Sequence, residues 1–154
     1  MNGVASAPGA GTVLNALATH TGAAFGIDVD TTATVDLIGD RTTVDGEIAA
    51  APDADTRLIE RCVELTTDRF GDGEGGRVRT ESEVPMAAGL KSSSAAANAT
   101  ILATLDALGV AVVDPTGERE LDGDAHETAA GEITALEACR IGVDAARDVG
   151  VTIT

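Results

Sequence analysis

The sequence predicts an α+β fold in which strands come in neighbouring pairs among helices. Residues 31–38 alternate apolar and polar side chains, which is typical of a half-buried strand. Residues 92–108 instead place Ala97, Ile101, Leu105 and Leu108 at helical spacing. Because the strands are paired and do not alternate regularly with helices, the pattern favours α+β over a doubly wound parallel sheet.

The first half of the chain is predicted to hold four strands and two helices. Residues 3–7 alternate small and apolar side chains until a break at residues 8–11, and Thr12 is expected to cap a short helix ending near His20. Strands are expected at residues 23–29, 31–38 and 42–48, followed by a helix from residues 52–55 to Phe70. The apolar face of that helix is Leu58, Ile59, Cys62, Val63 and Leu65. A glycine-rich loop at residues 71–76 leads to a strand at residues 77–84.

The second half is predicted to be mainly helical. The helix at residues 92–108 ends at Gly109, and an acidic connection begins at Asp114 and Pro115. The last helix is expected over residues 125–149, with one apolar face formed by Ile133, Leu136, Cys139 and Val143. Alternation of Val149, Val151 and Ile153 with small or polar residues predicts a new strand that begins just before the sequence ends at Thr154.

Composition excludes several classes of partner. The 154 residues carry 26 Asp and Glu against 10 Lys and Arg, a formal charge of −16, and Lys91 is the only lysine. A chain without a basic cluster is a poor ligand for nucleic acid or for an anionic membrane. The acid excess is spread over the whole chain, which is typical of proteins from a high-salt cytoplasm. No signal peptide or spanning segment is recognisable, so we expect a cytoplasmic protein in which Cys62 and Cys139 are buried, unpaired thiols.

Residues 83–98 carry the pattern most suggestive of chemistry. A strand reaches Pro85, a loop of small residues follows, and Ser92, Ser93 and Ser94 open a helix rich in alanine. Unpaired N–H groups at a helix N-terminus attract anions, serine hydroxyls can bind phosphate or Mg²⁺, and Lys91 adds positive charge. The alternative is a serine-capped helix with a solvated lysine. A Walker P-loop is excluded, because Leu90 and Pro85 stand where that motif requires glycine.

Residues 85–96 resemble the phosphate-binding motif of the GHMP kinase superfamily, Pro-x-x-x-Gly-Leu-Gly-Ser-Ser-Ala/Ser-Ala. The departure is Lys91, where most members have Gly or Ser, and lysine at this place is similar to the archaeal shikimate kinases. Residues 7–19, Ala-Pro-Gly-Ala-Gly-Thr-Val-Leu-Asn-Ala-Leu-Ala-Thr, together with residues 22–28, are similar to the N-terminal segment of the same family. The resemblance covers essentially the whole chain.

The resemblance implies a GHMP kinase N-terminal, ATP-binding domain over residues 1–154, of the ribosomal protein S5 domain 2-like fold. It also implies phosphorylation of the 3-hydroxyl of shikimate, a small-molecule substrate, with ATP and Mg²⁺. Ser93 would be the Mg²⁺ ligand, and Thr12 and Asn15 would contact the substrate. The ATP phosphates would lie against a loop of Pro85, Met86, Ala87, Ala88, Gly89, Leu90, Lys91, Ser92, Ser93, Ser94 and Ala95.

The resemblance also implies that part of the kinase lies beyond Thr154. In the family, a segment similar to residues 150–154 runs directly into Gly-Ala-Phe-Asp-Asp, which supplies the expected catalytic aspartate, so no catalytic residue is assigned within this sequence. We therefore expect a truncated or split kinase whose ferredoxin-like C-terminal domain is absent or nearly so, and which associates with that missing half. Asp144, Glu137 and Glu132 are candidates for an acidic Mg²⁺ ligand, each with solvated surface as the alternative. The other interpretations are another GHMP kinase, such as homoserine kinase, and a non-catalytic kinase-like binding domain.

Overall fold

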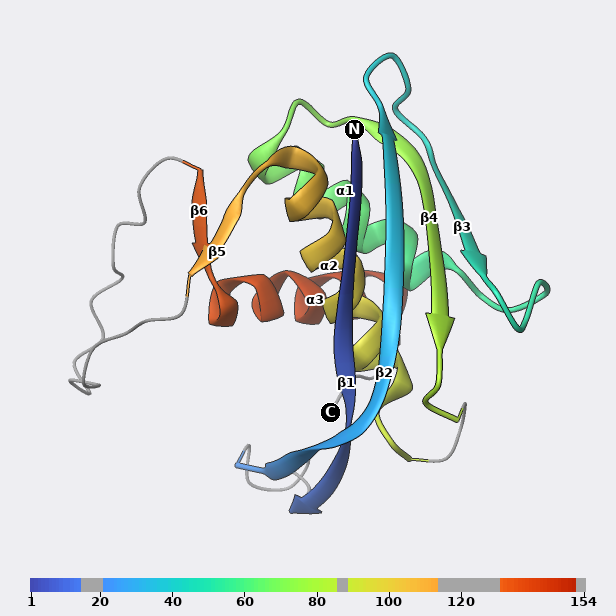
Figure 1. Cartoon of the computed structure of the whole chain (residues 1–154), viewed down its shortest axis with the longest axis vertical. Coiled ribbons are helices and arrows are strands. Elements are labelled where there is room, and N and C mark those ends of the chain that lie inside the picture. The colour runs from blue at the N-terminus through green and yellow to red at the C-terminus, as the bar shows by residue number, and fades with distance from the viewer. Residues whose placement is uncertain (15–20, 86–88, 114–130, 152–154) are drawn as a thin grey trace.

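The computed structural model describes residues 1–14, 21–85, 89–113 and 131–151, and it confirms the α+β class. Three helices and six strands are present within these ranges (Figure 1). In chain order they are β1 (Asn2–Leu14), β2 (Ala23–Ile38), β3 (Val44–Ile48), α1 (Arg57–Phe70), β4 (Gly75–Ser82), α2 (Ser92–Leu108), β5 (Ala111–Val113), β6 (Glu132–Thr134) and α3 (Ala135–Val149). None of the described helices has the length and apolar character needed to cross a bilayer.

Four of the strands form one sheet in the order β1-β2-β4-β3. β2 pairs antiparallel with β1 and with β4, so that Val35 lies between Gly3 and Val78, whereas β3 runs parallel to β4. The connection between these parallel neighbours is α1. β5 and β6 pair with each other in parallel, apart from the main sheet (Figure 1).

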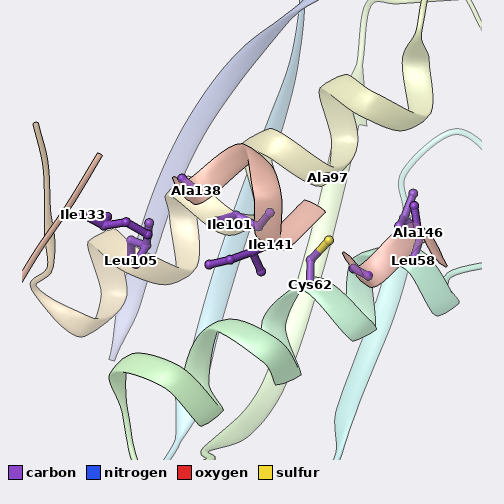
Figure 2. Close-up of a cluster of buried hydrophobic side chains, with 10 residues drawn as sticks. Leu58, Cys62, Ala97, Ile101, Leu105, Ile133, Ala138, Ile141 and Ala146 are labelled. Carbon is purple, nitrogen blue, oxygen red and sulfur yellow. The ribbon is translucent and has the colours of Figure 1, made fainter. Parts of the chain in front are cut away.

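The interior is built from aliphatic side chains in two clusters on either side of the α1–α2 pair. The first lies between the sheet and these helices, and consists of Ala7, Ala33, Val35, Leu37, Ile59, Val63, Val78, Ala99 and Ala103. In the second, shown in Figure 2, α1 and α2 contact α3 and β6 through Leu58, Cys62, Ala97, Ile101, Leu105, Ile133, Ala138, Ile141, Ala145 and Ala146. α1 and α2 each contribute side chains to both clusters, so both helices are held from two sides.

Gly3 allows α2 to pack directly on β1. A Cβ at this position would overlap the carbonyl oxygen of Ala103 and would lie 2.5 Å from the backbone nitrogen of Ala107. On the same helix, the Asp106 carboxylate accepts a hydrogen bond from the Val4 N–H at 3.1 Å. These contacts fix how α2 lies along the edge strand of the sheet.

The prediction for the N-terminal segment was partly wrong. β1 does not stop at residues 8–11 but continues to Leu14, with irregular register between Pro8 and Ala10. Proline is tolerated here because β1 is an edge strand, where a residue without an N–H need not remove a ladder bond. Thr12 consequently pairs with Ala24 and does not cap a helix, while residues 15–20 lie outside the described range. The two strands expected at residues 23–38 form the single strand β2.

The prediction for the last helix was also wrong at its start and in its buried face. α3 begins at Ala135, after an extended Thr134 that forms a capping box with Glu137, and the preceding residues form β6. Ile133 is buried as predicted, but Leu136, Cys139 and Val143 are exposed. Small residues allow α3 to approach α2 closely, since a Cβ on Gly142 would lie 3.3 Å from Ile101 Cδ1. The buried face consists of Ala138, Ile141, Gly142, Ala145 and Ala146.

The remaining predictions for the helices differ in detail. α2 begins and ends where predicted, and its C-cap Gly109 has a φ of 71°. α1 begins only at Arg57, after turns near residues 50–53. Cys62 is buried as predicted, and desolvation raises the pKa of its thiol to about 12.

The strand expected at the end of the sequence is not confirmed. Val149 is the last residue of α3 and does not open a strand. Gly150 caps the helix with a φ of 73°, and its N–H donates hydrogen bonds to the carbonyl oxygens of Ala146 and Arg147. Residues 152–154 lie outside the described range, so the prediction of an extended segment reaching Thr154 stays a prediction. The acidic connection at residues 114–130 lies outside that range as well.

Thr100→Val is expected to stabilise the fold. Within the described structure the Thr100 hydroxyl is fully buried without a hydrogen-bond partner, which costs about 1–3 kcal/mol. Valine keeps the shape and removes that cost, so the free energy of unfolding should rise by about 1 kcal/mol. The matched control is Thr104→Val, because the Thr104 hydroxyl donates to the Thr100 carbonyl oxygen at 2.7 Å. Denaturant unfolding of both variants checks this; equal effects would contradict it.

Candidate phosphate-binding site

The N-terminus of α2 presents unpaired backbone donors. The first helical bond joins the Ala95 N–H to the Lys91 carbonyl oxygen at 3.0 Å. The N–H groups of Ser92, Ser93 and Ser94 precede it, and none of them has an acceptor among the described residues. The three serines are only partly buried, so these donors and the adjacent hydroxyls can reach a ligand. Of the predicted loop, Met86, Ala87 and Ala88 lie outside the described range.

The backbone before the helix is held in an uncommon conformation. Lys91 has φ 54° and ψ 41°, and among the described residues it is the non-glycine with a positive φ. This left-handed conformation costs an L-residue about 1–2 kcal/mol. Left-handed and right-handed residues in succession turn neighbouring N–H groups toward one point, an arrangement that binds anions. Gly89, two residues earlier, has φ 72° and adopts the same region without a steric cost.

The electrostatics of this helix end favour an anion. The first turn of α2 contains no acidic residue, and Lys91 has no ion-pair partner in the described part of the chain. A lysine at a helix N-terminus faces the positive end of the helix dipole, which is unfavourable for the isolated fold. In a chain of net charge −16, an unneutralised lysine placed there makes a local positive site. A bound phosphate would satisfy both the lysine and the helix end.

A cavity of about 290 Å³ adjoins the same helix end. Ser92 and Ser93 form part of its wall, and the surrounding surface is largely aliphatic. The cavity is lined by Thr31, Ile48, Ala50, Ala54, Asp55, Leu58, Ile59, Thr80, Ser82, Val84, Ser92, Ser93, Ala96 and Val151. An apolar cavity of this size beside a row of anion donors can hold a flat heterocycle next to a phosphate chain.

Asp55 supplies the carboxylate of this cavity, and it is already paired. The Arg57 guanidinium contacts it through Nη2 at 2.6 Å and Nε at 2.9 Å. Those hydrogen bonds from Arg57 lower the pKa of Asp55 to about 2. Its charge is therefore balanced by Arg57, so Asp55 repels an incoming phosphate less than a free carboxylate would. Sequence reasoning missed Asp55 and the aliphatic wall, because their role depends on the approach of α1 to α2.

The two sequence motifs meet at this site. The Ala10 N–H donates to the Leu90 carbonyl oxygen at 3.1 Å, joining β1 to the residue before Lys91. Gly9 is buried at the same junction, where an added Cβ would lie 3.0 Å from Val84 Cγ2 and 3.1 Å from the Leu90 oxygen. Thr12 follows on β1 with an exposed side chain, and Asn15 lies outside the described residues.

The three acids considered as Mg²⁺ ligands have other surroundings. Glu137 accepts hydrogen bonds from the backbone N–H of Thr134 at 3.1 Å and from its hydroxyl at 2.9 Å, which lower the pKa of Glu137. Asp144 pairs with Arg147 at 3.2 Å. Glu137, Asp144 and Glu132 are all absent from the lining of the cavity beside Ser92. Among the described residues, no group of three or more His, Cys, Asp or Glu side chains is placed so that it could hold a metal ion. A serine hydroxyl oxygen at this helix end can serve as one ligand of a Mg²⁺ that is otherwise bound mainly by phosphate oxygens.

A helix N-terminus that presents hydrogen-bond donors for phosphate oxygens beside an apolar cavity is the kind of site expected of a nucleotide-dependent kinase. Residues 57–135 match the family GHMP kinases N terminal domain, and the chain belongs to that family. This match includes α1, β4, α2 and the loop at residues 83–91 between β4 and α2, which is the candidate phosphate loop.

Particular relatives are similar over the whole chain. A shikimate kinase of Halobacterium salinarum (strain ATCC 29341 / DSM 671 / R1) is 58% identical over 154 residues, which are 100% of this chain and 48% of that protein. A shikimate kinase of Methanosarcina mazei is 50% identical over 100% of this chain and 45% of its own length. The chain thus spans about half the length of the curated relatives it matches. The similarity to a Halobacterium protein agrees with the halophilic character predicted from the acid excess.

Solved structures support the fold. The Methanococcus jannaschii mevalonate kinase aligns with 99% of this chain and 48% of its own, with a TM-score of 0.68 and 12% identity. A mevalonate diphosphate decarboxylase from Staphylococcus aureus aligns with 94% of this chain and 42% of its own, with a TM-score of 0.65 and 16% identity. The predicted GHMP kinase N-terminal fold is therefore confirmed.

Proposed function

We propose that this chain is the ATP-binding part of a kinase that phosphorylates the 3-hydroxyl of shikimate with ATP and Mg²⁺. The observation that carries the proposal is the helix end at Ser92–Ser94. Three N–H groups without an acceptor among the described residues stand there beside Lys91, which has no ion-pair partner within the same ranges. The shikimate kinases that resemble this chain at 58% and 50% identity support the choice of substrate.

The chain's own residues are assigned to binding and orientation. The N–H groups of residues 92–94 hold phosphate oxygens, and the Lys91 ammonium balances the charge of the β- and γ-phosphates. Ser93 offers its hydroxyl to Mg²⁺, which neutralises the charge that develops during phosphoryl transfer. The aliphatic cavity beside Ser92 takes the nucleobase. Its wall is largely apolar, and it adjoins the N–H groups that hold the phosphate oxygens.

The acceptor alcohol is assigned to the side of the loop where β1 lies. The hydrogen bond from Ala10 to Leu90 supports this placement, because it sets residues 9–14 beside the phosphate loop. Thr12 and Asn15 are the proposed hydroxyl partners.

The group that removes the proton from the alcohol is assigned to the half of the kinase that this chain does not span. The resemblance at residues 150–154 supports this assignment, because in the family the similar segment is followed by the expected catalytic aspartate. Thr154 itself lies outside the described residues, so the position of that aspartate relative to Lys91 stays a prediction. We expect the assembled enzyme to act in the cytoplasm.

Two measurements test the proposal. Calorimetric titration of this chain in concentrated KCl should detect Mg-ATP binding; no detectable binding would favour the non-catalytic binding domain. Coexpression with the remaining half of the Halobacterium salinarum kinase should then give ADP release that depends on shikimate. Turnover of homoserine or mevalonate in place of shikimate would refute the substrate while leaving the kinase assignment intact.

A further inference from the structure

The last residue of β4 carries a hydroxyl with several hydrogen-bond partners. Ser82 Oγ lies 2.7 Å from Thr31 Oγ1 on the neighbouring strand β2, and it accepts a hydrogen bond from the Val84 N–H at 3.1 Å. It also donates to the Val84 carbonyl oxygen at 3.3 Å. Thr31 is buried and pairs directly with Ser82 in the β2–β4 ladder. The Ser82 hydroxyl therefore ties the chain that leaves β4 to the interior of the sheet.

Val84 lies at the start of the phosphate loop, and β1 connects it to the end of that loop. The Val84 side chain is buried. Val84 Cγ2 and the Leu90 carbonyl oxygen both lie beside Gly9, at 3.0 Å and 3.1 Å from where a Cβ on that residue would stand. The same Leu90 oxygen accepts the hydrogen bond from the Ala10 N–H at 3.1 Å. Because both ends of the loop contact the same part of β1, a shift at Val84 would disturb the contacts of Leu90.

Ser82 also belongs to the wall of the candidate site. Ser82 and Val84 line the cavity of about 290 Å³ that Ser92 and Ser93 line from α2. The end of the loop runs directly into Lys91 and the first turn of the helix. The place of the phosphate donors relative to this cavity therefore depends on how both ends of the loop are held.

A second hydroxyl pair on β2 provides a comparison away from this site. Ser6 Oγ lies 2.7 Å from Thr32 Oγ1, the same separation as between Ser82 and Thr31. Each pair joins directly opposed residues of neighbouring strands. Since successive residues of a strand point to opposite faces, Thr32 faces away from the cavity. The two pairs match in chemistry and length, and they differ in that the Ser82 pair holds the start of the phosphate loop.

We propose that Ser82 is a positioning residue of the nucleotide site. Its hydroxyl fixes Val84, and through the contacts at Gly9 this sets where Lys91 and the donors at residues 92–94 stand. The inference rests on the proposed function. A loop that also visits other conformations binds its ligand with an affinity reduced by the fraction of molecules in the binding conformation. Loss of the hydroxyl should therefore weaken nucleotide binding although Ser82 itself need not touch the nucleotide.

Mg-ATP titration of variants at the two hydroxyl pairs is the first test. Ser82→Ala should lower Mg-ATP affinity about tenfold, which is comparable with the net contribution of one hydrogen bond. Ser82→Thr keeps the hydroxyl and should restore the affinity, and the matched control Ser6→Ala should bind as the parent chain does. Ser82 and Ser6 are both exposed, so thermal unfolding should show a folded chain in each case. In the kinase assembled with the remaining half of the Halobacterium salinarum enzyme, Ser82→Ala should raise the KM for ATP and leave kcat unchanged, whereas partial unfolding would lower kcat alone.

Amide hydrogen exchange tests the positioning without any nucleotide. In Ser82→Ala the Val84 N–H loses its acceptor, and the Ala10 N–H should also exchange faster because the Leu90 oxygen is no longer held in place. Ser6→Ala should change neither rate. An unchanged rate at Ala10 in Ser82→Ala would overturn the proposal, as would an equal loss of Mg-ATP affinity in Ser6→Ala or no recovery in Ser82→Thr. Absence of Mg-ATP binding by the parent chain would contradict the proposed function, while the rate at Ala10 would still decide whether Ser82 positions the loop.

Discussion

Lys91→Gly is expected to stabilise the isolated fold and at the same time to weaken Mg-ATP binding. Glycine adopts the left-handed conformation of residue 91 without steric cost, which should raise the free energy of unfolding by about 1 kcal/mol. The same change removes the ammonium group beside the N–H groups that are proposed to hold phosphate oxygens. By comparison with the loss of other charge stabilisers, the rate of the assembled kinase should fall about a hundredfold or more.

Two further variants at the same residue separate backbone strain from charge. Lys91→Ala keeps the left-handed conformation but removes the ammonium, so it should lose activity and gain less stability than Lys91→Gly, because only the unfavourable contact with the helix dipole is relieved. Lys91→Arg keeps both the strain and the charge, and should retain most of the binding. Thermal unfolding and Mg-ATP titration of the three variants provide the measurements. A near-normal rate for Lys91→Ala would contradict the proposed phosphate contact and favour a solvated Lys91 side chain.

The bounds of α2 could be predicted from the sequence because their signals are local. Serines at the start of an alanine-rich helix, a glycine two residues before the lysine and a terminal Gly109 each act within a few residues of where they stand. α2 accordingly begins and ends as predicted. The left-handed conformation of Lys91 was not predictable in this way, because sequence preference assigns such a position to glycine or asparagine.

The edge strand and the last helix depended on tertiary contacts, and there the sequence prediction failed. Pro8 and Gly9 signal a break, but β2 on one side and the Leu90 carbonyl on the other keep β1 extended through them. In α3 two faces compete for burial, and hydrophobicity alone favours the one with Leu136 and Val143. The face with Ala138 and Gly142 is buried because close approach to α2 requires small residues.

Gly9→Val is expected to weaken nucleotide binding by displacing the phosphate loop. The added Cβ would lie 3.0 Å from Val84 Cγ2, 3.1 Å from the Leu90 oxygen and 3.2 Å from Ile27 Cδ1, and the valine methyl groups extend further. Overpacking of this kind costs about 1–3 kcal/mol. Because the Leu90 carbonyl also accepts the bond from Ala10, relief of the clash moves the residue before Lys91. If the loop shifts to relieve the clash and must be moved back when nucleotide binds, the same energy is lost from binding, and Mg-ATP affinity falls by about 5- to 150-fold.

The matched control for Gly9→Val lies on β2, opposite the residue that follows Gly9. Gly26 pairs with Ala10, and nothing lies within 4 Å of a Cβ added to it, so Gly26→Val introduces the same β-branched side chain into open space. It should leave both stability and Mg-ATP affinity close to those of the parent chain. Equal losses of affinity in the two variants would mean that β-branching in the β1–β2 ladder is responsible and not contact with the loop. A loss confined to Gly9→Val would make the N-terminal motif a positioning element for the phosphate donors at residues 92–94, because the packing at Gly9 would then control where those donors stand.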